Sequence, residues 1–261
     1  LHLGTTADAE EIKDTANAQP LIVATSLLGA HALGLTNFAV TSGHSVGELA
    51  AAALSGAISS SDALSLVRSR GVEMAKAAAV TPAGMSAVLG GDRNEVLAAI
   101  AALNLVAAND NGAGQIVAAG DLTALAQLSD NPPASARVRA LAVAGAFHTS
   151  YMQPAVEPLR AQAATIATHP VQINVISNKD GEVVSDGAEV LTRIVNQIAN
   201  PVRWDLCMET LKSLGVTGVI ELPPAGTLVG LLKRAASEIE SFALKSADDL
   251  PAAREFAERH L

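Results

Sequence analysis

The sequence is short of aromatic residues, charged residues and cysteine. Aromatic residues make up 2% and charged residues 16% of the chain, against 49% apolar residues. The core must therefore be aliphatic, and so apolar a composition is not that of an intrinsically disordered protein. Cys207 is the single cysteine, which excludes an internal disulfide and fits a reducing compartment.

Basic residues are also in deficit. The chain has 17 Lys and Arg against 26 Asp and Glu, a net charge of −9, so it lacks the basic field that a nucleic-acid backbone requires. The longest apolar stretch, residues 21–35, is too short and too polar to span a membrane. The acidic first residues do not form a secretory signal. We therefore expect a cytoplasmic protein that binds neither nucleic acid nor membrane.

The length of 261 residues suits one large domain that carries a smaller one. Strands and helices alternate over residues 1–82 and 146–261, which predicts a large subdomain with a parallel sheet and helices on both faces. In this part, residues 216–222 form an apolar run typical of a strand buried on both faces. Residues 83–145 follow the order β-α-β-β-α-β of an inserted, ferredoxin-like small subdomain. The predicted fold class is α/β.

A candidate nucleophile lies between a predicted strand and a predicted helix. Residues 43–47 read Gly-His-Ser-Val-Gly, which fits the G-x-S-x-G elbow that lifts a serine hydroxyl out of a sheet. The elbow would make Ser45 the nucleophile. The backbone N–H of Val46, at the start of a helix, would stabilise an oxyanion. The alternative is a chance match to three fixed residues.

A serine nucleophile needs a base, and the chain has six histidines. His148 follows a predicted strand at the point where the small subdomain rejoins the large one. A loop at such a junction forms a natural wall of a cleft, so His148 is the candidate base. The alternative is a loop histidine that serves only the local backbone.

Arg70 falls within the apolar arc of a predicted helix that also carries Leu66 and Met74. An inward guanidinium costs free energy unless an anion meets it. Because the planar fork of arginine binds a carboxylate through two hydrogen bonds, a substrate carboxylate is one candidate partner. A structural salt bridge, or snorkelling along the helix, is the other interpretation. The sequence has no P-loop, no dinucleotide-binding glycine motif and no Cys/His cluster with metal-site spacing, so we expect no metal and no cofactor.

Together these residues resemble the malonyl-CoA:acyl-carrier-protein transacylases of fatty acid synthesis. The resemblance runs over residues 5–250 and is carried by the elbow with Glu48, by Arg70, and by the segments 109–120, 145–148, 197–204 and 223–228. It implies an α/β-hydrolase-like large subdomain with a ferredoxin-like insertion. It also implies an acyltransferase that moves a malonyl group from malonyl-CoA to the phosphopantetheine thiol of acyl carrier protein, through a malonyl-serine.

The resemblance also implies roles for single residues. Ser45 and His148 would form a dyad, with the ring of His148 oriented by the backbone carbonyl of Gln197. Arg70 would hold the free malonyl carboxylate, and the bulk of Phe147 would exclude an α-methyl group. The remaining substrate-binding positions that we expect are Asn109, Asn111 and Met74. We expect the protein to act as a monomer.

The printed sequence departs from the family pattern at its start. The family begins with a strand that ends in a Gly-Gln-Gly-x-Gln loop, ahead of the position at which Leu1 aligns. The glutamine of that loop supplies part of the oxyanion hole. Because removal of one such donor costs about 10²–10³ in rate, we expect reduced activity from a chain that lacks it.

Three other functions remain open at the level of sequence. A serine esterase would share the elbow, but it would need a carboxylate as third triad member and would not need an inward arginine. A truncated, non-catalytic protein that binds CoA or acyl carrier protein would form no acyl-enzyme. An acyltransferase module of a polyketide synthase would be expected to carry linkers at its ends.

Overall fold

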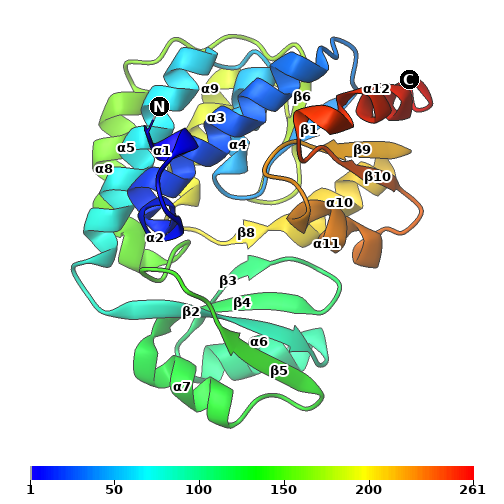
Figure 1. Ribbon diagram of the computed structural model, residues 1–261. Coiled ribbons are helices and arrows are strands. Elements are labelled where there is room, and N and C mark those ends of the chain that lie inside the picture. Colours follow the sequence, from blue (N-terminus) through cyan, green and yellow to red (C-terminus); the bar gives the residue numbers. More distant parts are fainter. Residues whose placement is uncertain (1) are drawn as a thin grey trace.

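The computed structural model describes residues 2–261; Leu1, which the sequence assigns to the large subdomain, lies outside the described residues. Figure 1 shows helices and short strands in the upper part and a sheet with two helices below. The α-helices are α1 (His2–Thr5), α2 (Ala9–Lys13), α3 (Thr15–Leu33), α4 (Gly47–Leu54), α5 (Ser60–Ala78), α6 (Arg93–Ala102), α7 (Leu122–Asp130), α8 (Gln153–Ala163), α9 (Gly187–Gln197), α10 (Trp204–Ser213), α11 (Thr227–Ala235) and α12 (Leu250–Glu258). The 3-10 helices are η1 (Ser150–Met152) and η2 (Ala247–Asp249). The strands are β1 (Val40–Ser42), β2 (Ala83–Gly90), β3 (Val106–Asp110), β4 (Gln115–Asp121), β5 (Ala136–Ala140), β6 (Asn174–Ile176), β7 (Val183–Val184), β8 (Val202–Arg203), β9 (Gly218–Glu221) and β10 (Glu240–Ala243).

The lower part is a sheet in the order β5-β2-β4-β3-β8, with α6 and α7 beside it (Figure 1). Its first four strands pair antiparallel, as the β-α-β-β-α-β pattern predicts. The fifth, β8, comes from far along the chain and pairs parallel with β3, with Asn109 opposite Val202. This short strand was not predicted, and it ties the last part of the chain to the small sheet. We propose boundaries at 1–82, 83–145 and 146–261, with β8 crossing between the subdomains.

The upper part holds two small sheets, in the orders β1-β6-β7 and β10-β9. β1 pairs with β6 and β9 pairs with β10, both parallel, whereas β7 pairs antiparallel with β6. The largest buried cluster joins apolar side chains of α4, α5, α8 and α9, and α3 packs against α5. The expectation for residues 216–222 was wrong in one respect. Only Glu221 of β9 is buried, and the other β9 residues are partly exposed. In the described part of the chain β9 and β10 form a separate two-stranded sheet.

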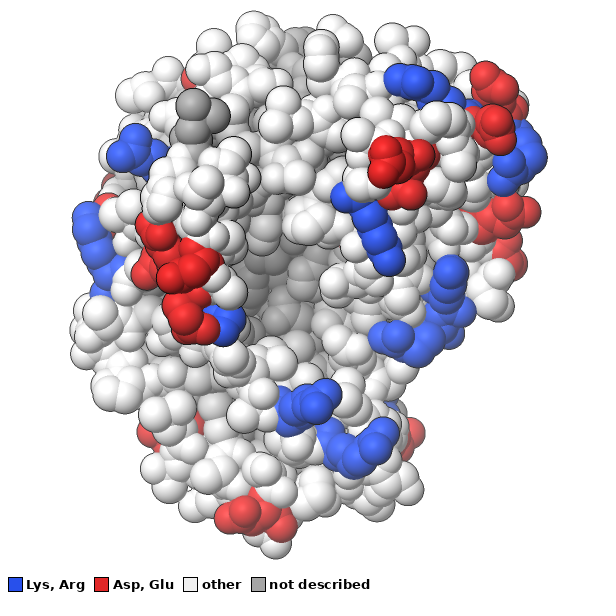
Figure 2. All heavy atoms as spheres, in the orientation of Figure 1, with Lys and Arg blue, Asp and Glu red and all other residues white. Residues whose placement is uncertain are grey.

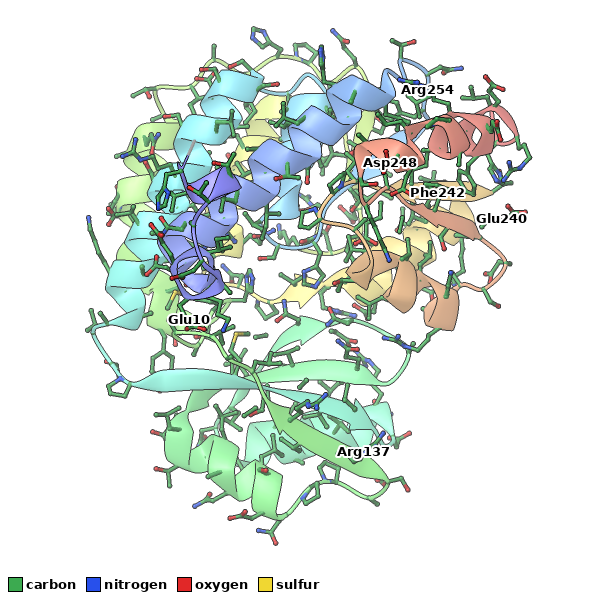
Figure 3. The ribbon with its side chains drawn as sticks, in the orientation of Figure 1. Glu10, Arg137, Glu240, Phe242, Asp248 and Arg254 are labelled. Atoms are coloured by element: carbon green, nitrogen blue, oxygen red, sulfur yellow. The ribbon has the colours of Figure 1, made fainter. Side chains whose placement is uncertain are left out.

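The C-terminal helix α12 returns to the end of α3. The guanidinium of Arg254 donates to the backbone carbonyls of Leu33 at 3.0 Å and Ala32 at 2.6 Å. These are among the carbonyls that the last turn of a helix leaves unpaired, so the contact stabilises both elements. Figure 3 shows Arg254 on α12 beside the strand β10, which carries Phe242. Within residues 2–261, no helix combines the length and apolarity needed to cross a membrane.

Candidate active site

The elbow between β1 and α4 is tight and strained. A side-chain carbon on Gly43 would collide with the backbone of Gly47, so only glycine fits there. Ser45 has φ 54°, a left-handed conformation that is uncommon outside glycine and concentrates at functional sites. Its N–H donates to the Asn178 side-chain oxygen at 2.7 Å. The serine is held by these contacts in the geometry that the G-x-S-x-G motif predicts.

His148 lies against the serine, although 103 residues separate the two in sequence. Its Nε2 is 2.7 Å from the Ser45 hydroxyl, and its Nδ1 is 2.9 Å from the Gln197 backbone carbonyl. A carbonyl only accepts, so Nδ1 carries the proton and Nε2 is the acceptor for the serine proton. His148 also has a positive φ, 61°. The structure thus brings together the three groups that the sequence assigns to the dyad and its orienting carbonyl.

The electrostatic environment keeps His148 neutral. Burial, and then the positive charge of Arg70, lower the pKa of His148 to about 3. The ring is therefore neutral at neutral pH, and its Nε2 lone pair is available to accept a proton.

Arg70 points inward from α5 and is 2% exposed. Its guanidinium donates to the side-chain oxygens of Gln19 at 2.5 Å and Gln197 at 3.0 Å, and to the Ser45 hydroxyl at 3.3 Å. All these partners are neutral, and among residues 2–261 no salt bridge of Arg70 is found. Burial lowers the pKa of Arg70 to about 10, so it remains a cation at neutral pH. The site has a positive charge beside its nucleophile.

Phe147 and Met74 flank this centre. Phe147 is half-buried and packs against the main helical cluster and also against the apolar face of the small sheet. Met74 follows Arg70 by one turn of α5, is 1% exposed, and accepts a 3.6 Å hydrogen bond from Gln19. Val46 stands at the N-cap of α4. The roles of these three residues stay predictions.

Asn109 and Asn111 come from the small sheet. Both are buried, on β3 and directly after it. Asn111 reaches across to the elbow, where its side-chain oxygen is 2.8 Å from Nε2 of His44. The His44 ring meets Trp204 edge-on at 5.6 Å, and burial lowers its pKa. His44 thus turns away from Ser45 and connects the elbow to the small sheet.

Three polar residues of the site were not identified from the sequence: Glu48, Asn178 and Gln19. All three are buried. Signals for them existed, since Glu48 lies in an otherwise apolar helix and Gln19 lies one turn before the buried Val23. Asn178 follows β6 at the carboxyl end of a parallel strand, the edge at which sites of α/β proteins collect.

Metal-site geometry is not found in the described part of the chain, where no three His, Cys, Asp or Glu side chains are grouped to hold an ion. Cys207 is buried, and burial raises the pKa of its thiol to about 12. Thiolates and not thiols are reactive, so Cys207 is inert.

Comparison with known proteins agrees with this geometry. The family model of the acyl transferase domain matches residues 2–254. The chain is 53% identical over 253 residues to the malonyl CoA-acyl carrier protein transacylase of Mycobacterium tuberculosis, covering 95% of this chain and 84% of the relative.

Solved structures agree as well. The crystal structure of the Mycobacterium tuberculosis enzyme matches with a TM-score of 0.94 and 52% identity, over 97% of this chain and 85% of that one. A complex of a type II PKS acyl-carrier protein with its malonyl-transacylase contains a chain that matches with a TM-score of 0.90 and 27% identity, over 97% of this chain and 85% of that one. This chain belongs to the malonyl CoA-acyl carrier protein transacylases, within the acyl transferase domain family.

Proposed function

We propose that this chain transfers a malonyl group from malonyl-CoA to the phosphopantetheine thiol of acyl carrier protein, through a malonyl ester of Ser45. The observation that carries the proposal is the placement of Arg70. Its buried cation lies 3.3 Å from the Ser45 hydroxyl, and its hydrogen-bond partners among residues 2–261 are neutral groups. A substrate that brings a carboxylate next to its reacting thioester would neutralise that charge.

In the first half-reaction, Nε2 of His148 takes the proton of the Ser45 hydroxyl. The oxygen attacks the thioester carbonyl, and the N–H of Val46 stabilises the negative charge that develops on the carbonyl oxygen. The tetrahedral intermediate then expels CoA, and the proton on His148 passes to the departing sulfur. A malonyl-serine remains, with its free carboxylate on Arg70.

In the second half-reaction, the phosphopantetheine thiol gives its proton to His148 and its sulfur attacks the ester. The C–O bond to Ser45 breaks, and the proton returns to the serine oxygen. The new thioester leaves with acyl carrier protein and the enzyme is restored. Two successive transfers through one covalent intermediate predict ping-pong kinetics.

Selectivity belongs to the groups around this path. Arg70 favours acyl groups that carry a carboxylate, and Phe147 fills the space that an α-methyl group would need. Asn109, Asn111 and Met74 complete the substrate site. Figure 2 shows a hollow between the upper and lower parts of one face, with Lys and Arg side chains on its right. This positive charge suits the phosphates of CoA.

The partners and setting follow from the same proposal. The chain acts on malonyl-CoA and acyl carrier protein, without a cofactor, as a cytoplasmic monomer. The complex of a similar transacylase with an acyl-carrier protein supports the second substrate.

The test is the intact mass of the protein after it is mixed with malonyl-CoA. We expect a gain of one malonyl group in the native chain and no gain in Ser45→Ala. Addition of acyl carrier protein carrying phosphopantetheine should then remove the group. Persistent absence of a malonyl adduct would contradict the proposal. Rapid multiple turnover of p-nitrophenyl acetate without preference for malonyl-CoA would favour an esterase instead.

A further inference from the structure

Glu48 is a buried carboxylate directly behind the nucleophile. It lies in the first turn of α4 and is 3% exposed. One carboxylate oxygen accepts from the backbone N–H of Asn178 at 2.5 Å, and the other accepts from the side-chain amide of Gln197 at 2.5 Å. Burial of an ionisable group is costly unless it is hydrogen-bonded, so these two contacts determine where the carboxylate and its partners lie.

Gln197 connects Glu48 to the base and to the cation. Its backbone carbonyl accepts from Nδ1 of His148 at 2.9 Å, and its side-chain oxygen accepts from Arg70 at 3.0 Å. Its amide nitrogen, which donates to Glu48, also lies 3.1 Å from the Ser45 backbone carbonyl. The Gln197 amide nitrogen also lies 3.2 Å from the Asn178 side-chain oxygen. The contact to the carboxylate is the shortest of these three and helps to fix which way the Gln197 amide faces, and that orientation presents an oxygen to Arg70.

Asn178 connects Glu48 to the elbow. The same residue that gives its N–H to Glu48 accepts the N–H of Ser45 at 2.7 Å and donates to the Gly43 carbonyl at 2.9 Å. Asn178 is fully buried. The strained backbone of the nucleophile is thus supported by a side chain whose own backbone is held by Glu48.

Glu48 also supplies negative charge near Arg70. The two are coupled electrostatically, and Glu48 partly offsets the lowering of the Arg70 pKa by burial. The other ionisable groups that act on the Glu48 site are Arg193 of α9 and Cys207 of α10. Burial raises the pKa of Glu48 to about 7, against the attraction of the two arginines.

We propose that Glu48 is a positioning residue for acyl transfer, acting through Gln197 and Asn178 to hold His148, Arg70 and Ser45 in reactive geometry. The inference rests on the proposed function of the site. In the Ser-His-Asp triad the carboxylate contacts the histidine directly. Here the contact to the histidine is a backbone carbonyl, and the carboxylate lies one residue further away, where it orients the glutamine that supplies that carbonyl.

Two substitutions separate the charge of Glu48 from its reach. In Glu48→Gln a single amide oxygen replaces two acceptors, so the new NH₂ must face either the NH₂ of Gln197 or the backbone N–H of Asn178. One of these two donors then loses its acceptor, and the residue that carries it is free to shift. In Glu48→Asp the charge stays, but the side chain is one methylene shorter and cannot reach both partners.

Glu221 provides a matched control. It too is a buried carboxylate, and it accepts from the backbone N–H groups of Gly226, Leu228 and Val229, each at 2.9 Å. It lies at the end of β9, before α11, and within residues 2–261 its side-chain hydrogen bonds go to the start of α11 and not to Ser45 or His148. We expect Glu221→Gln to lower Tm, because it too removes a buried carboxylate. We expect it to leave the acylation rate of Ser45 unchanged.

The experiment is rapid-quench acylation of Ser45 by malonyl-CoA and by acetyl-CoA, read by intact mass. The amplitude counts competent sites and the rate reports the chemistry. For Glu48→Gln we expect a rate about 10- to 100-fold below that of the native chain, by a similar factor for both substrates, because the dyad is disturbed and not only Arg70. The acylation rate of Glu48→Asp should lie between that of the native chain and that of Glu48→Gln. Glu221→Gln should keep the native rate.

The outcomes are distinguishable. If Glu48→Gln is acylated at the native rate and with full amplitude, Glu48 is only a structural residue. That outcome would overturn the inference but leave the proposed function intact. If Glu48→Gln does not fold, Glu48→Asp decides, since a lowered rate at full amplitude supports the inference and a native rate overturns it. A native chain that forms no malonyl-serine would overturn the proposed function and the inference with it.

Discussion

The site has two sides that differ in the groups they carry. The nucleophile side, made of Ser45, Arg70, His148 and Gln197, comes from the upper part of the molecule. Its residues are joined by hydrogen bonds, one of which is donated by the buried cation of Arg70. The amide side, made of Asn109 and Asn111, comes from the small sheet and is neutral. The buried charge of the site, on Arg70, thus lies in the large subdomain. We propose that the nucleophile side carries the chemistry and the amide side the fit of the substrate; Phe147 packs against both.

The largest effect should come from the base on the nucleophile side. His148→Ala removes the acceptor 2.7 Å from the Ser45 hydroxyl, and general base catalysis contributes about 10²–10⁴ in rate. We expect the acylation rate with malonyl-CoA to fall by a factor in that range. The matched change on the amide side, Asn111→Ala, removes one hydrogen bond worth about 1 kcal/mol and should cost less than tenfold. Equal losses in the two variants would erase the distinction between the sides.

The next effect concerns the cation. Arg70→Ala removes the proposed partner of the malonyl carboxylate, a charged contact worth about 2–5 kcal/mol when buried. We expect kcat/KM for malonyl-CoA to fall by about 30-fold or more, since 1.4 kcal/mol is a factor of ten. Transfer from acetyl-CoA should be spared, because the acetyl group carries no free carboxylate that could pair with Arg70. An equal loss with both substrates would remove Arg70 from substrate recognition, and Arg70→Lys is the control that keeps the charge.

A smaller effect is expected where the two sides meet. Phe147→Ser opens space beside the acyl group, and one methyl or methylene in such a pocket is worth about 1–3 kcal/mol. We expect the preference for malonyl-CoA over methylmalonyl-CoA to weaken by about tenfold or more, measured as the ratio of the two kcat/KM values. Unchanged selectivity would mean that another residue shapes the pocket.

The smallest effect is on stability and its pH dependence. The His148 pKa of about 3 lies below its ordinary value of 6.5, so the unfolded state binds more protons between these values and the free energy of unfolding falls as the pH drops from about 6.5 towards 3. Each kcal/mol lost should lower Tm by about 2–4 °C. His148→Ala should flatten this acid limb in a thermal melt series, whereas Asn111→Ala should not.

Glu48 acts with the opposite sign on the same side of the site. Its pKa of about 7 lies above its ordinary value of 4.5. The contribution of Glu48 to the free energy of unfolding is therefore fully present below about pH 4.5 and is lost as the pH rises through 7. Glu48→Gln should remove that decline. If the free energy of unfolding of Glu48→Gln still declines as the pH rises, another group causes the decline.

The regular parts of the fold were predictable. The small sheet and its two helices follow from alternation and from turn residues, and β2, α6, β3, β4, α7 and β5 occur in the predicted order β-α-β-β-α-β. β8 was not predictable, because a strand of two residues has no pattern of its own and exists only through its pairing with β3.

The site divides in the same way. Ser45 could be found from its local motif, because a tight turn between strand and helix demands small residues around the nucleophile. The inward direction of Arg70 could be found from the helix period. Glu48 and Asn178 could not be assigned a partner, because they lie 130 residues apart and meet through a single hydrogen bond.

By itself, therefore, the sequence determined the aliphatic core, the α/β class, the elbow at Ser45 and the inward face of Arg70. These depend on composition and on short periodic patterns, which act over a few residues. Only the tertiary structure decided that His148 meets Ser45 across 103 positions, that neutral amides surround Arg70, and that Glu48 stands behind them. The reason is physical. Hydrogen bonds between distant segments form only after packing has brought the segments together, and no local pattern records which buried polar groups will then meet.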